Sequence, residues 1–263
     1  MRHHGQALSV NISIMFTEHP YLERFAAARD AGFDNVETWW PFSSPVPQAA
    51  AVDAWLAAAE AAGVSVDAIN FHAGDMPAGE RGVCALPERH PELSASLPTL
   101  HSLAVATGCT KFNLLYGQPS TPDHAEPAAQ AYRAAARAVE TIGGTVLLEP
   151  LASGLNGSYP LLTMIDIETF ATDHLADLDN LRLLLDTFHL GMNGVDPADA
   201  FDCSLPVGHV QIADPPSRGE PGSGTLDWDR FFAAVTDSGY RGMVGCEYRP
   251  TTTTTDSLGW IRP

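Results

Sequence analysis

The chain has 263 residues, enough for one α/β barrel or for two smaller domains. Its 32 Asp and Glu residues outnumber its 14 Lys and Arg residues, which gives a formal net charge of −18 at pH 7. Because phosphate binding needs clustered basic side chains, this balance argues against nucleic acids and anionic membranes as partners. No run approaches the roughly 18 apolar residues of a spanning helix, and the first residues lack the apolar core of a signal peptide.

The four cysteines are scattered along the chain and form no Cys-x-x-Cys pair: Cys84, Cys109, Cys203 and Cys246. Cysteines this sparse do not make a disulfide scaffold and are typical of buried thiols in a reducing compartment. We therefore expect a cytoplasmic protein.

Short apolar runs alternate with alanine-rich runs from one end of the chain to the other. The apolar runs predict strands at residues 9–15, 35–38, 64–71, 111–116, 145–149, 181–186, 208–213 and 243–248. The runs between them predict helices at residues 21–31, 49–62, 91–107, 122–142, 163–175 and 227–238. Several of these helices end at a glycine, as Gly63 and Gly108 illustrate. The threonine run 251–255 is expected to cap one last short helix.

Strict alternation of strand and helix favours a parallel sheet, and eight strands in this length fit a closed (β/α)8 TIM barrel. The alternative is an open doubly wound sheet, which usually carries a glycine-rich phosphate turn after its first strand. Here residues 15–18 (Met-Phe-Thr-Glu) follow the first strand, so the barrel is preferred. No linker or charge block divides the chain, and we expect a single domain over residues 1–263.

A polar residue stands at the end of each of the last four predicted strands: Glu149, Asp186, Gln211 and Glu247. Burying a polar group at a strand end costs free energy without a packing gain. In a TIM barrel the C-terminal strand ends form the mouth that carries catalytic groups. The four side chains are therefore expected to line one side of that mouth. Three converging carboxylates need a cation, and an oxygen-only ligand set favours Mg²⁺ or Mn²⁺ over Zn²⁺.

Other candidate residues follow the predicted strands. His189 lies three residues after Asp186, and Arg218 lies in a Gly- and Pro-rich loop where it could hold a substrate carboxylate by a bidentate contact. The stretch from His72 to Gly82, which includes Asp75, Glu80 and Arg81, is interpreted as a lid or substrate-side loop. The aromatic residues expected to wall the pocket are Phe16, Trp39, Trp40 and Phe42.

Seven motifs in this order resemble the hydroxypyruvate isomerase family of the xylose isomerase-like barrels. They are residues 11–16 (Asn-Ile-Ser-Ile-Met-Phe), 73–82 (Ala-Gly-Asp-Met-Pro-Ala-Gly-Glu-Arg-Gly), 148–150 (Leu-Glu-Pro), 186–189 (Asp-Thr-Phe-His), 209–214 (His-Val-Gln-Ile-Ala-Asp), 218–222 (Arg-Gly-Glu-Pro-Gly) and 245–248 (Gly-Cys-Glu-Tyr). The resemblance implies that Glu149, Asp186, Gln211 and Glu247 bind the metal. It also implies that Glu149 and Glu247 are the acid/base pair. The chain departs from better-known members at His72, where they have Pro, and in the less polar loop after Pro150.

The function expected from these observations is the interconversion of hydroxypyruvate and tartronate semialdehyde through a metal-stabilised enediolate. Arg218 would anchor the substrate carboxylate, His189 would hydrogen-bond a substrate oxygen, and His72 would border the substrate. An alternative is an isomerase or epimerase of a longer 2-oxo acid or ketose, such as a 2-oxo-tetronate. Further alternatives are a glycosidase with paired glutamates, a DNA-repair endonuclease and a non-catalytic metal- or ligand-binding barrel. A homodimer or homotetramer is also expected, partly from exposed aromatic residues.

Overall fold

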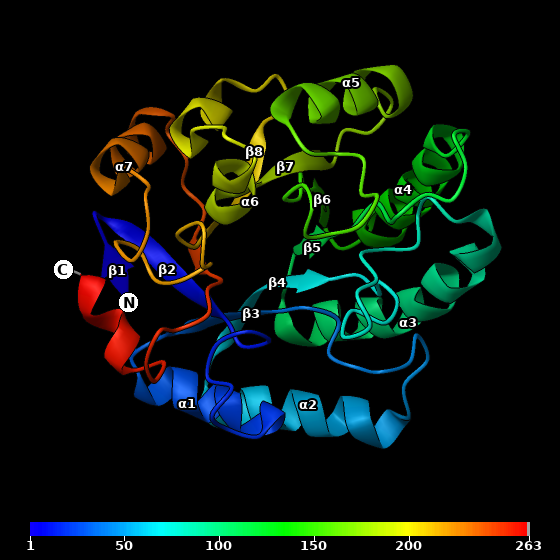
Figure 1. The fold of residues 1–263 in the computed structure, drawn as a ribbon. Coiled ribbons are helices and arrows are strands. Elements are labelled where there is room, and N and C mark those ends of the chain that lie inside the picture. Colours follow the sequence, from blue (N-terminus) through cyan, green and yellow to red (C-terminus); the bar gives the residue numbers. More distant parts are fainter. Residues whose placement is uncertain (262–263) are drawn as a thin grey trace.

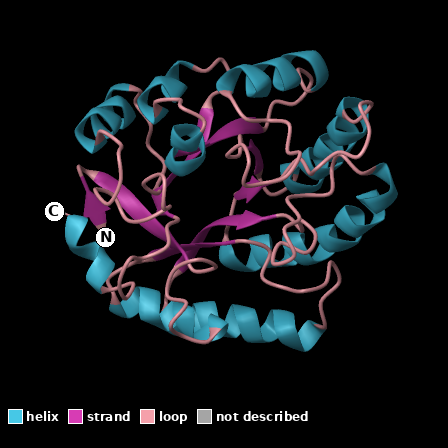
Figure 2. Ribbon diagram, viewed as in Figure 1, coloured by secondary structure: helices cyan, strands magenta, loops and turns pink. Residues whose placement is uncertain are grey.

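The computed structural model describes residues 1–261 and has a closed barrel of eight parallel strands, β2 to β9, inside a ring of helices (Figures 1 and 2). The strands are β1 Arg2–His3, β2 Gln6–Asn11, β3 Asn35–Thr38, β4 Ser65–Asn70, β5 Lys111–Asn113, β6 Thr145–Leu148, β7 Leu181–Asp186, β8 Val207–Ile212 and β9 Val244–Cys246. Each strand of the barrel pairs with the next, and β2 closes the ring by pairing with β9. The predicted TIM barrel is confirmed.

Helices follow the strands and cover the outside of the barrel (Figure 2). They are α1 Arg24–Asp30, α2 Ala49–Ala62, α3 His90–Thr107, α4 Ala125–Glu140, α5 Met164–His174, α6 Thr187–Met192 and α7 Trp228–Asp237, with 3₁₀ turns η1 Tyr21–Glu23, η2 Pro87–Arg89, η3 Pro197–Asp202 and η4 Asp256–Trp260. Gly63 and Gly108 end α2 and α3 in the left-handed conformation that glycine adopts without strain. Thr163 and Asp166 form a capping box at the start of α5.

Most predicted elements match the observed ones to within three residues, and the largest error is in the first strand. Strand β2 covers Gln6–Asn11, whereas 9–15 was predicted, because the chain turns where the N–H of Met15 bonds the carbonyl of Asn11. One strand and one α-helix were not predicted: β1, which pairs antiparallel with β2, and α6, which starts directly after β7. The short helix expected after the threonine run is η4. In Figure 1 it lies beside β1, and the ring centroids of His3 and Trp260 are 4.9 Å apart.

The core of the described residues is one continuous cluster of apolar side chains, and the single domain over residues 1–263 stays a prediction. Cys84, Cys109 and Cys246 are buried and Cys203 is partly buried, and all four are free thiols. Among residues 1–261 no helix is long and apolar enough to cross a membrane. In the described part of the chain, the large hydrophobic side chains that are exposed are all aliphatic, so the exposed aromatic residues on which the expected homo-oligomer partly rested are not found there, and the homo-oligomer stays a prediction.

The register of the barrel brings the predicted polar positions to one edge. Asp186 is the partner of Gln211 across β7 and β8, and Gln211 is the partner of Gly245 across β8 and β9. Glu149 comes directly after β6, and Glu247 directly after β9. Because all eight strands are parallel, these positions share the C-terminal mouth of the barrel.

Gly82 joins the loop after β4 to the segment after β5, and we predict that Gly82→Ala is destabilising. Gly82 has φ +105°, and a Cβ atom there would lie 2.0 Å from the carbonyl oxygen of Leu115. Backbone strain and overpacking together should cost about 2–4 kcal/mol. We expect the Tm in a calorimetric scan to fall by roughly 5–10 °C. The matched control is Gly259→Ala, whose Cβ would meet nothing within 4 Å; an equal loss in both variants would contradict the explanation.

Candidate active site

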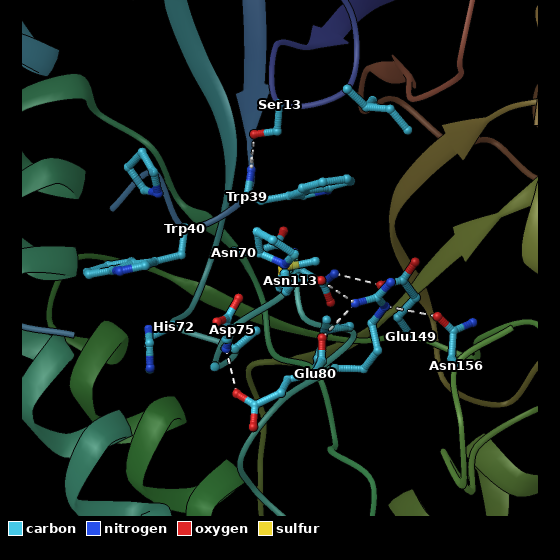
Figure 3. Close-up of a pocket in the computed structure, with 18 of the residues that line it drawn as sticks. Ser13, Trp39, Trp40, Asn70, His72, Asp75, Glu80, Asn113, Glu149 and Asn156 are labelled. Atoms are coloured by element: carbon cyan, nitrogen blue, oxygen red, sulfur yellow. Dashed lines mark hydrogen bonds between the residues drawn. The ribbon is translucent and has the colours of Figure 1, made fainter. Parts of the chain in front are cut away.

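A cavity of about 830 Å³ opens at the C-terminal mouth of the barrel and is lined by strand ends and the loops after them (Figure 3). Its volume falls within the usual range for small-molecule sites. Glu149 and Glu247 line the cavity together with His189 and Arg218, whereas Asp186 and Gln211 are buried behind these side chains. The four strand-end residues predicted from the sequence are thus brought to the same region.

Glu149 and Glu247 are each held by amide or indole donors from other strands. Glu149 Oε2 accepts a 2.7 Å hydrogen bond from Asn113 Nδ2, at the end of β5. Glu247 Oε1 accepts 2.7 Å hydrogen bonds from Asn11 Nδ2 and from Trp39 Nε1. These contacts fix the orientation of both carboxylates. Glu149 Oε1 and Glu247 Oε2 accept none of these hydrogen bonds and remain for other partners in the site.

Asp186 serves two roles with its two carboxylate oxygens. Oδ1 accepts hydrogen bonds from the backbone N–H groups of Phe188 (2.8 Å) and His189 (3.4 Å), and so caps helix α6. Oδ2 points the other way, 3.1 Å from Arg218 Nη2 and 3.6 Å from His189 Nε2. Asp186 can therefore cap helix α6 with Oδ1 and still offer Oδ2 to a metal ion or another ligand in the site.

The three carboxyl groups are electrostatically unfavourable as they stand. Burial raises the pKa of Glu149 well above its usual value, and the charges of Asp186 and Glu247 raise it further. Burial also raises the pKa of Asp186, and it raises the pKa of Glu247 to about 8 although Arg218 acts in the opposite direction. Carboxyl groups this buried and this close to one another indicate a functional site rather than a structural ion pair.

Arg218 supplies the positive charge nearest to this acidic cluster. Its Nη2 donates to Asp186 Oδ2 and to Glu247 Oε2, and its guanidinium lies 5.0 Å from the centre of the Phe188 ring. The loop that carries it is organised by buried Asp214, whose carboxylate accepts hydrogen bonds from the N–H groups of Gly222, Thr225 and Leu226 and from Trp228 Nε1. Arg218 itself has φ +58°, a strained conformation of the kind that clusters at functional sites.

His189 is neutral, and its tautomer follows from its partners. Burial, followed by the charges of Arg218 and Arg81, lowers the pKa of its imidazole well below the usual value. Its Nδ1 accepts a 2.9 Å hydrogen bond from the N–H of Ala152, so the ring proton is on Nε2. Nε2 lies 3.8 Å from Glu149 Oε1 and faces the acidic cluster as a donor. A protonated Nε2 has no lone pair for a metal, so His189 fits the hydrogen-bonding role that was predicted for it.

Gln211 directs its amide nitrogen at carboxylates on both sides. Nε2 lies 2.9 Å from Glu37 Oε2 and 3.3 Å from Glu247 Oε1. Its oxygen Oε1 has no hydrogen-bond partner among the described residues and is available to a ligand.

His72 and the loop after it form the wall opposite Glu149 (Figure 3). His72 is buried, its Nε2 lies 3.4 Å from Glu92 Oε2, and its Nδ1 has no partner within residues 1–261. Asp75 and Glu80 lie in the same loop, and the Glu80 carboxylate accepts from the N–H of Asp75. The interpretation of this stretch as a substrate-side loop agrees with its position along the cavity.

Arg81 extends from that loop into the cavity. It donates to Asn156 Oδ1 (2.9 Å) and to the carbonyls of Met76 and Glu80, and none of these partners is a carboxylate. Burial lowers the pKa of Arg81, and the nearby Arg218 guanidinium lowers it further. Two guanidinium groups that line the same cavity favour an anionic ligand in it.

Three of the four predicted aromatic residues line the cavity: Trp39, Trp40 and Phe42. Phe16 does not, because the turn after β2 buries it in the hydrophobic core, where its N–H bonds Thr254 Oγ1. Several polar residues of the site were not predicted from the sequence, among them Asn11, Glu37, Asn113 and Asn156. The first three lie within strands, where a single polar residue is not distinctive. The run Val36-Glu37-Thr38 and the pair Phe112-Asn113 were nevertheless signals of the same kind as the strand-end residues.

Within residues 1–261, two groups of side chains have the spacing needed for a metal ion: Glu149 with Asp186 and His189, and Glu37 with Asp67 and His209. In the second group the ammonium of Lys111 already bonds both oxygens of Asp67, at 2.9 and 3.0 Å. In the first region, three ionised carboxylates would face a single guanidinium, which leaves two excess negative charges. A divalent cation matches that excess, and the free oxygen of Gln211 adds a neutral oxygen ligand of the type that Mg²⁺ and Mn²⁺ accept.

The comparisons with known proteins agree with this geometry. The family model described as "Xylose isomerase-like TIM barrel" matches residues 25–263. A protein of Streptomyces coelicolor named "Putative hydroxypyruvate isomerase" is 39% identical, with 97% of this chain and 95% of the relative covered. A "2-oxo-tetronate isomerase" of Cupriavidus necator is 33% identical, with 97% of each covered.

Among solved structures, a Brucella melitensis protein named "AP endonuclease, family 2" superposes with a TM-score of 0.85 at 29% identity, and 97% of each chain is covered. The match of the family model and the near full-length similarity of the relatives lead to one conclusion. The chain belongs to the hydroxypyruvate isomerase family of the xylose isomerase-like TIM barrels.

Proposed function

We propose that the protein is an isomerase that interconverts hydroxypyruvate and tartronate semialdehyde. The observation that carries the proposal is the cluster of three buried carboxyl groups, Glu149, Asp186 and Glu247, with one guanidinium against them. This cluster lies at the end of a cavity that Arg81 also lines. It is the arrangement expected of an enzyme that binds a divalent ion and a small anionic substrate.

The residues proposed to hold the ion are Glu149, Asp186, Gln211 and Glu247, and the ion is Mg²⁺ or Mn²⁺. Their oxygen donors and the excess negative charge fit such an ion. When bound, it would act as a Lewis acid on the carbonyl oxygen and the neighbouring hydroxyl oxygen of the substrate.

Glu149 and Glu247 are the proposed acid/base pair. One glutamate removes a proton from the hydroxymethyl carbon of hydroxypyruvate, which gives an enediolate across the two adjacent carbons. The same or the opposite glutamate returns a proton to the former carbonyl carbon, and the hydroxyl proton moves to the other oxygen. The hydrogen bonds from Asn113, Asn11 and Trp39 hold the two carboxylates in place, and His189 Nε2–H donates to a substrate oxygen.

The substrate carboxylate is proposed to bind Arg218, as the sequence predicted, with Arg81 as a second contact. Arg218 is engaged with Asp186 and Glu247 through Nη2, whereas its Nη1 has no such partner in the described part of the chain. Arg81 has no acidic hydrogen-bond partner among the described residues, so a substrate carboxylate would give it a charge-assisted contact that it lacks. This pair of guanidinium groups favours a 2-oxo acid over an uncharged ketose.

A longer 2-oxo acid is the second candidate substrate. The cavity of about 830 Å³ is large for a three-carbon acid, and His72 lies on the wall opposite Glu149. The relative from Cupriavidus necator is named for a 2-oxo-tetronate. An extended substrate could reach from the acidic cluster toward His72 without changing the proposed chemistry.

Nucleic-acid repair is disfavoured, although the similar Brucella protein is named as an endonuclease. The net charge of −18 opposes binding to a phosphate backbone, and the proposed ligands are oxygen atoms rather than histidine nitrogens. A non-catalytic barrel would not need both Glu149 and Glu247 in the cavity.

The central prediction concerns turnover by purified protein and by glutamate variants. We expect hydroxypyruvate to be converted to tartronate semialdehyde, measured by coupled reduction. EDTA should abolish the activity and Mg²⁺ or Mn²⁺ should restore it. Glu149→Gln or Glu247→Gln should lower kcat by roughly 10²- to 10⁴-fold, because an amide cannot transfer the proton.

The matched control is Glu92→Gln, since Glu92 lines the same cavity but pairs with Arg89; its kcat should stay within about threefold. Normal turnover by either catalytic variant would rule out the proposed acid/base pair. Turnover of a four-carbon 2-oxo acid but not of hydroxypyruvate would favour the second candidate.

Thermal stabilisation by Mg²⁺ is predicted to be larger at pH 8 than at pH 6. Burial and mutual repulsion raise the pKa values of Glu149, Asp186 and Glu247 in the metal-free protein. Ionising them as the pH rises therefore costs stability, which a bound cation restores, whereas protons compete with the cation at pH 6. At pH 8 and about 100 times Kd, binding should add about 2.7 kcal/mol. The Tm is compared with NaCl of equal ionic strength, and an equal or larger shift at pH 6 would contradict the proposed site.

Substrate binding is predicted to weaken when Arg81 is replaced by methionine. Loss of a charge-assisted contact of about 1.5–3 kcal/mol should raise KM roughly 10- to 100-fold and leave kcat within a few-fold. Arg89→Met is the control, because the Arg89 guanidinium is already paired with Glu80 and Glu92. An unchanged KM for Arg81→Met, in protein with normal Tm, would exclude Arg81 from substrate binding.

A further inference from the structure

Glu37 is a buried carboxylate in the interior of the barrel that the proposed reaction does not use. It lies on β3 with a relative exposure of 1% and reaches toward Gln211 on β8. Strands β3 and β8 are not neighbours, because β2 and β9 lie between them in the barrel. The Glu37 side chain therefore crosses the barrel interior, which in this fold is usually filled with apolar side chains.

Gly245 provides the space for this crossing. A Cβ atom at position 245 would lie 1.9 Å from Glu37 Oε1. Gly245 is the register partner of Ser9 on β2 and of Gln211 on β8. It therefore lies on the path that the Glu37 side chain takes from β3 to Gln211. No other residue type could stand at position 245 while Glu37 reaches Gln211.

The carboxylate of Glu37 is surrounded by polar side chains. Its Oε1 accepts from Ser9 Oγ and lies 3.0 Å from His209 Nε2, and its Oε2 accepts from Gln211 Nε2 at 2.9 Å. His209 Nδ1 in turn lies 3.7 Å from Asp67 Oδ2, and Lys111 pairs with Asp67. This series of polar contacts holds Glu37 from the side away from the acidic cluster.

The contact with Glu37 determines which end of the Gln211 amide faces the site. An ionised carboxylate can only accept hydrogen bonds, so the amide must turn its nitrogen toward Glu37. The second neighbour of Nε2, Glu247 Oε1, is farther away at 3.3 Å and belongs to a proposed ligand of the cation, so Glu37 is the closer constraint on the amide. The oxygen Oε1 is then directed away from Glu37 and toward a ligand. A flipped amide would set oxygen against oxygen and present an N–H group to a cation.

We propose that Glu37 is a positioning residue that orients the amide of Gln211 so that its oxygen, and not its nitrogen, binds the cation. The inference rests on the proposed metal site. Outer-shell groups that orient metal ligands typically contribute 10- to 100-fold to metal affinity. Glu37 is predicted to act at this level although it does not touch the ion or the substrate.

The test is a double-mutant cycle read out by Mn²⁺ binding to the full-length, EDTA-treated protein, in a calorimeter or by the EPR signal of free Mn²⁺. Glu37→Gln can pair with either end of Gln211, so we expect a 10- to 100-fold rise in the Kd for Mn²⁺. In Gln211→Glu the two oxygens of residue 211 are equivalent and no end has to be chosen. Adding Glu37→Gln to that variant should change Kd by less than about threefold or improve binding, because it also removes a repulsion.

The double-mutant cycle distinguishes an effect of Glu37 on the orientation of the Gln211 amide from a general effect of its negative charge on metal binding. If Glu37 acted only through its negative charge, Glu37→Gln would weaken binding by the same factor in both backgrounds, which would overturn the proposal. Asp67→Asn is the matched carboxylate-to-amide control, since Asp67 belongs to the same polar network without touching Gln211. It should leave Kd within about threefold, and a loss equal to that of Glu37→Gln would also overturn the proposal.

Failure of the metal site and failure of the role of Glu37 give different results. Absence of Mn²⁺ binding to the unmodified protein would refute the proposed metal site together with this inference. Normal binding by the unmodified protein and by Glu37→Gln would refute the inference alone. The Tm of each variant, measured without metal, distinguishes a loss of orientation from a loss of folding.

Discussion

The organising constraint of this protein is the burial of three carboxyl groups at one end of a barrel with one guanidinium to balance them. Removing a charge from water is costly unless it is paired, and here the pairing is incomplete. Burial and repulsion raise the pKa values of Glu149, Asp186 and Glu247, which indicates that the fold disfavours the ionised forms of these groups. The proposed cation supplies the missing charge, and the same strain makes the site responsive to it.

The barrel can hold this arrangement because it is rigid around the site. Each carboxylate is fixed by a donor from a different strand or loop, and Asp186 gains a further contact by capping α6. The loop that carries Arg218 is fixed through buried Asp214 rather than through the substrate. The chemistry is therefore supported by contacts that lie outside the cavity, which is how the TIM barrel accommodates many reactions on one scaffold.

Polar side chains also surround Glu37 in the barrel interior, below the mouth. Gly245, Ser9 and His209 are unusual choices for a barrel core, and each is explained by its distance to Glu37. A buried polar network of this kind is costly unless every member is satisfied. The proposed role of this network is to fix the amide of Gln211 beside a cation.

The sequence by itself determined the fold class, the strand order and the four residues at the last four strand ends. It could do so because apolar periodicity and strand-end polarity are local signals, and parallel strands force their ends to one edge. The motifs also indicated the family to which the chain belongs.

Tertiary structure decided what no local signal contains. It buried Phe16 in the core, brought Asn11, Asn113 and Trp39 to the glutamates, and set Arg81 near Arg218. It also brought Glu37 across the barrel to Gln211, 174 residues further along the chain. Such contacts depend on barrel closure and register, which bring together residues that are distant in sequence, and a reading along the chain cannot supply them.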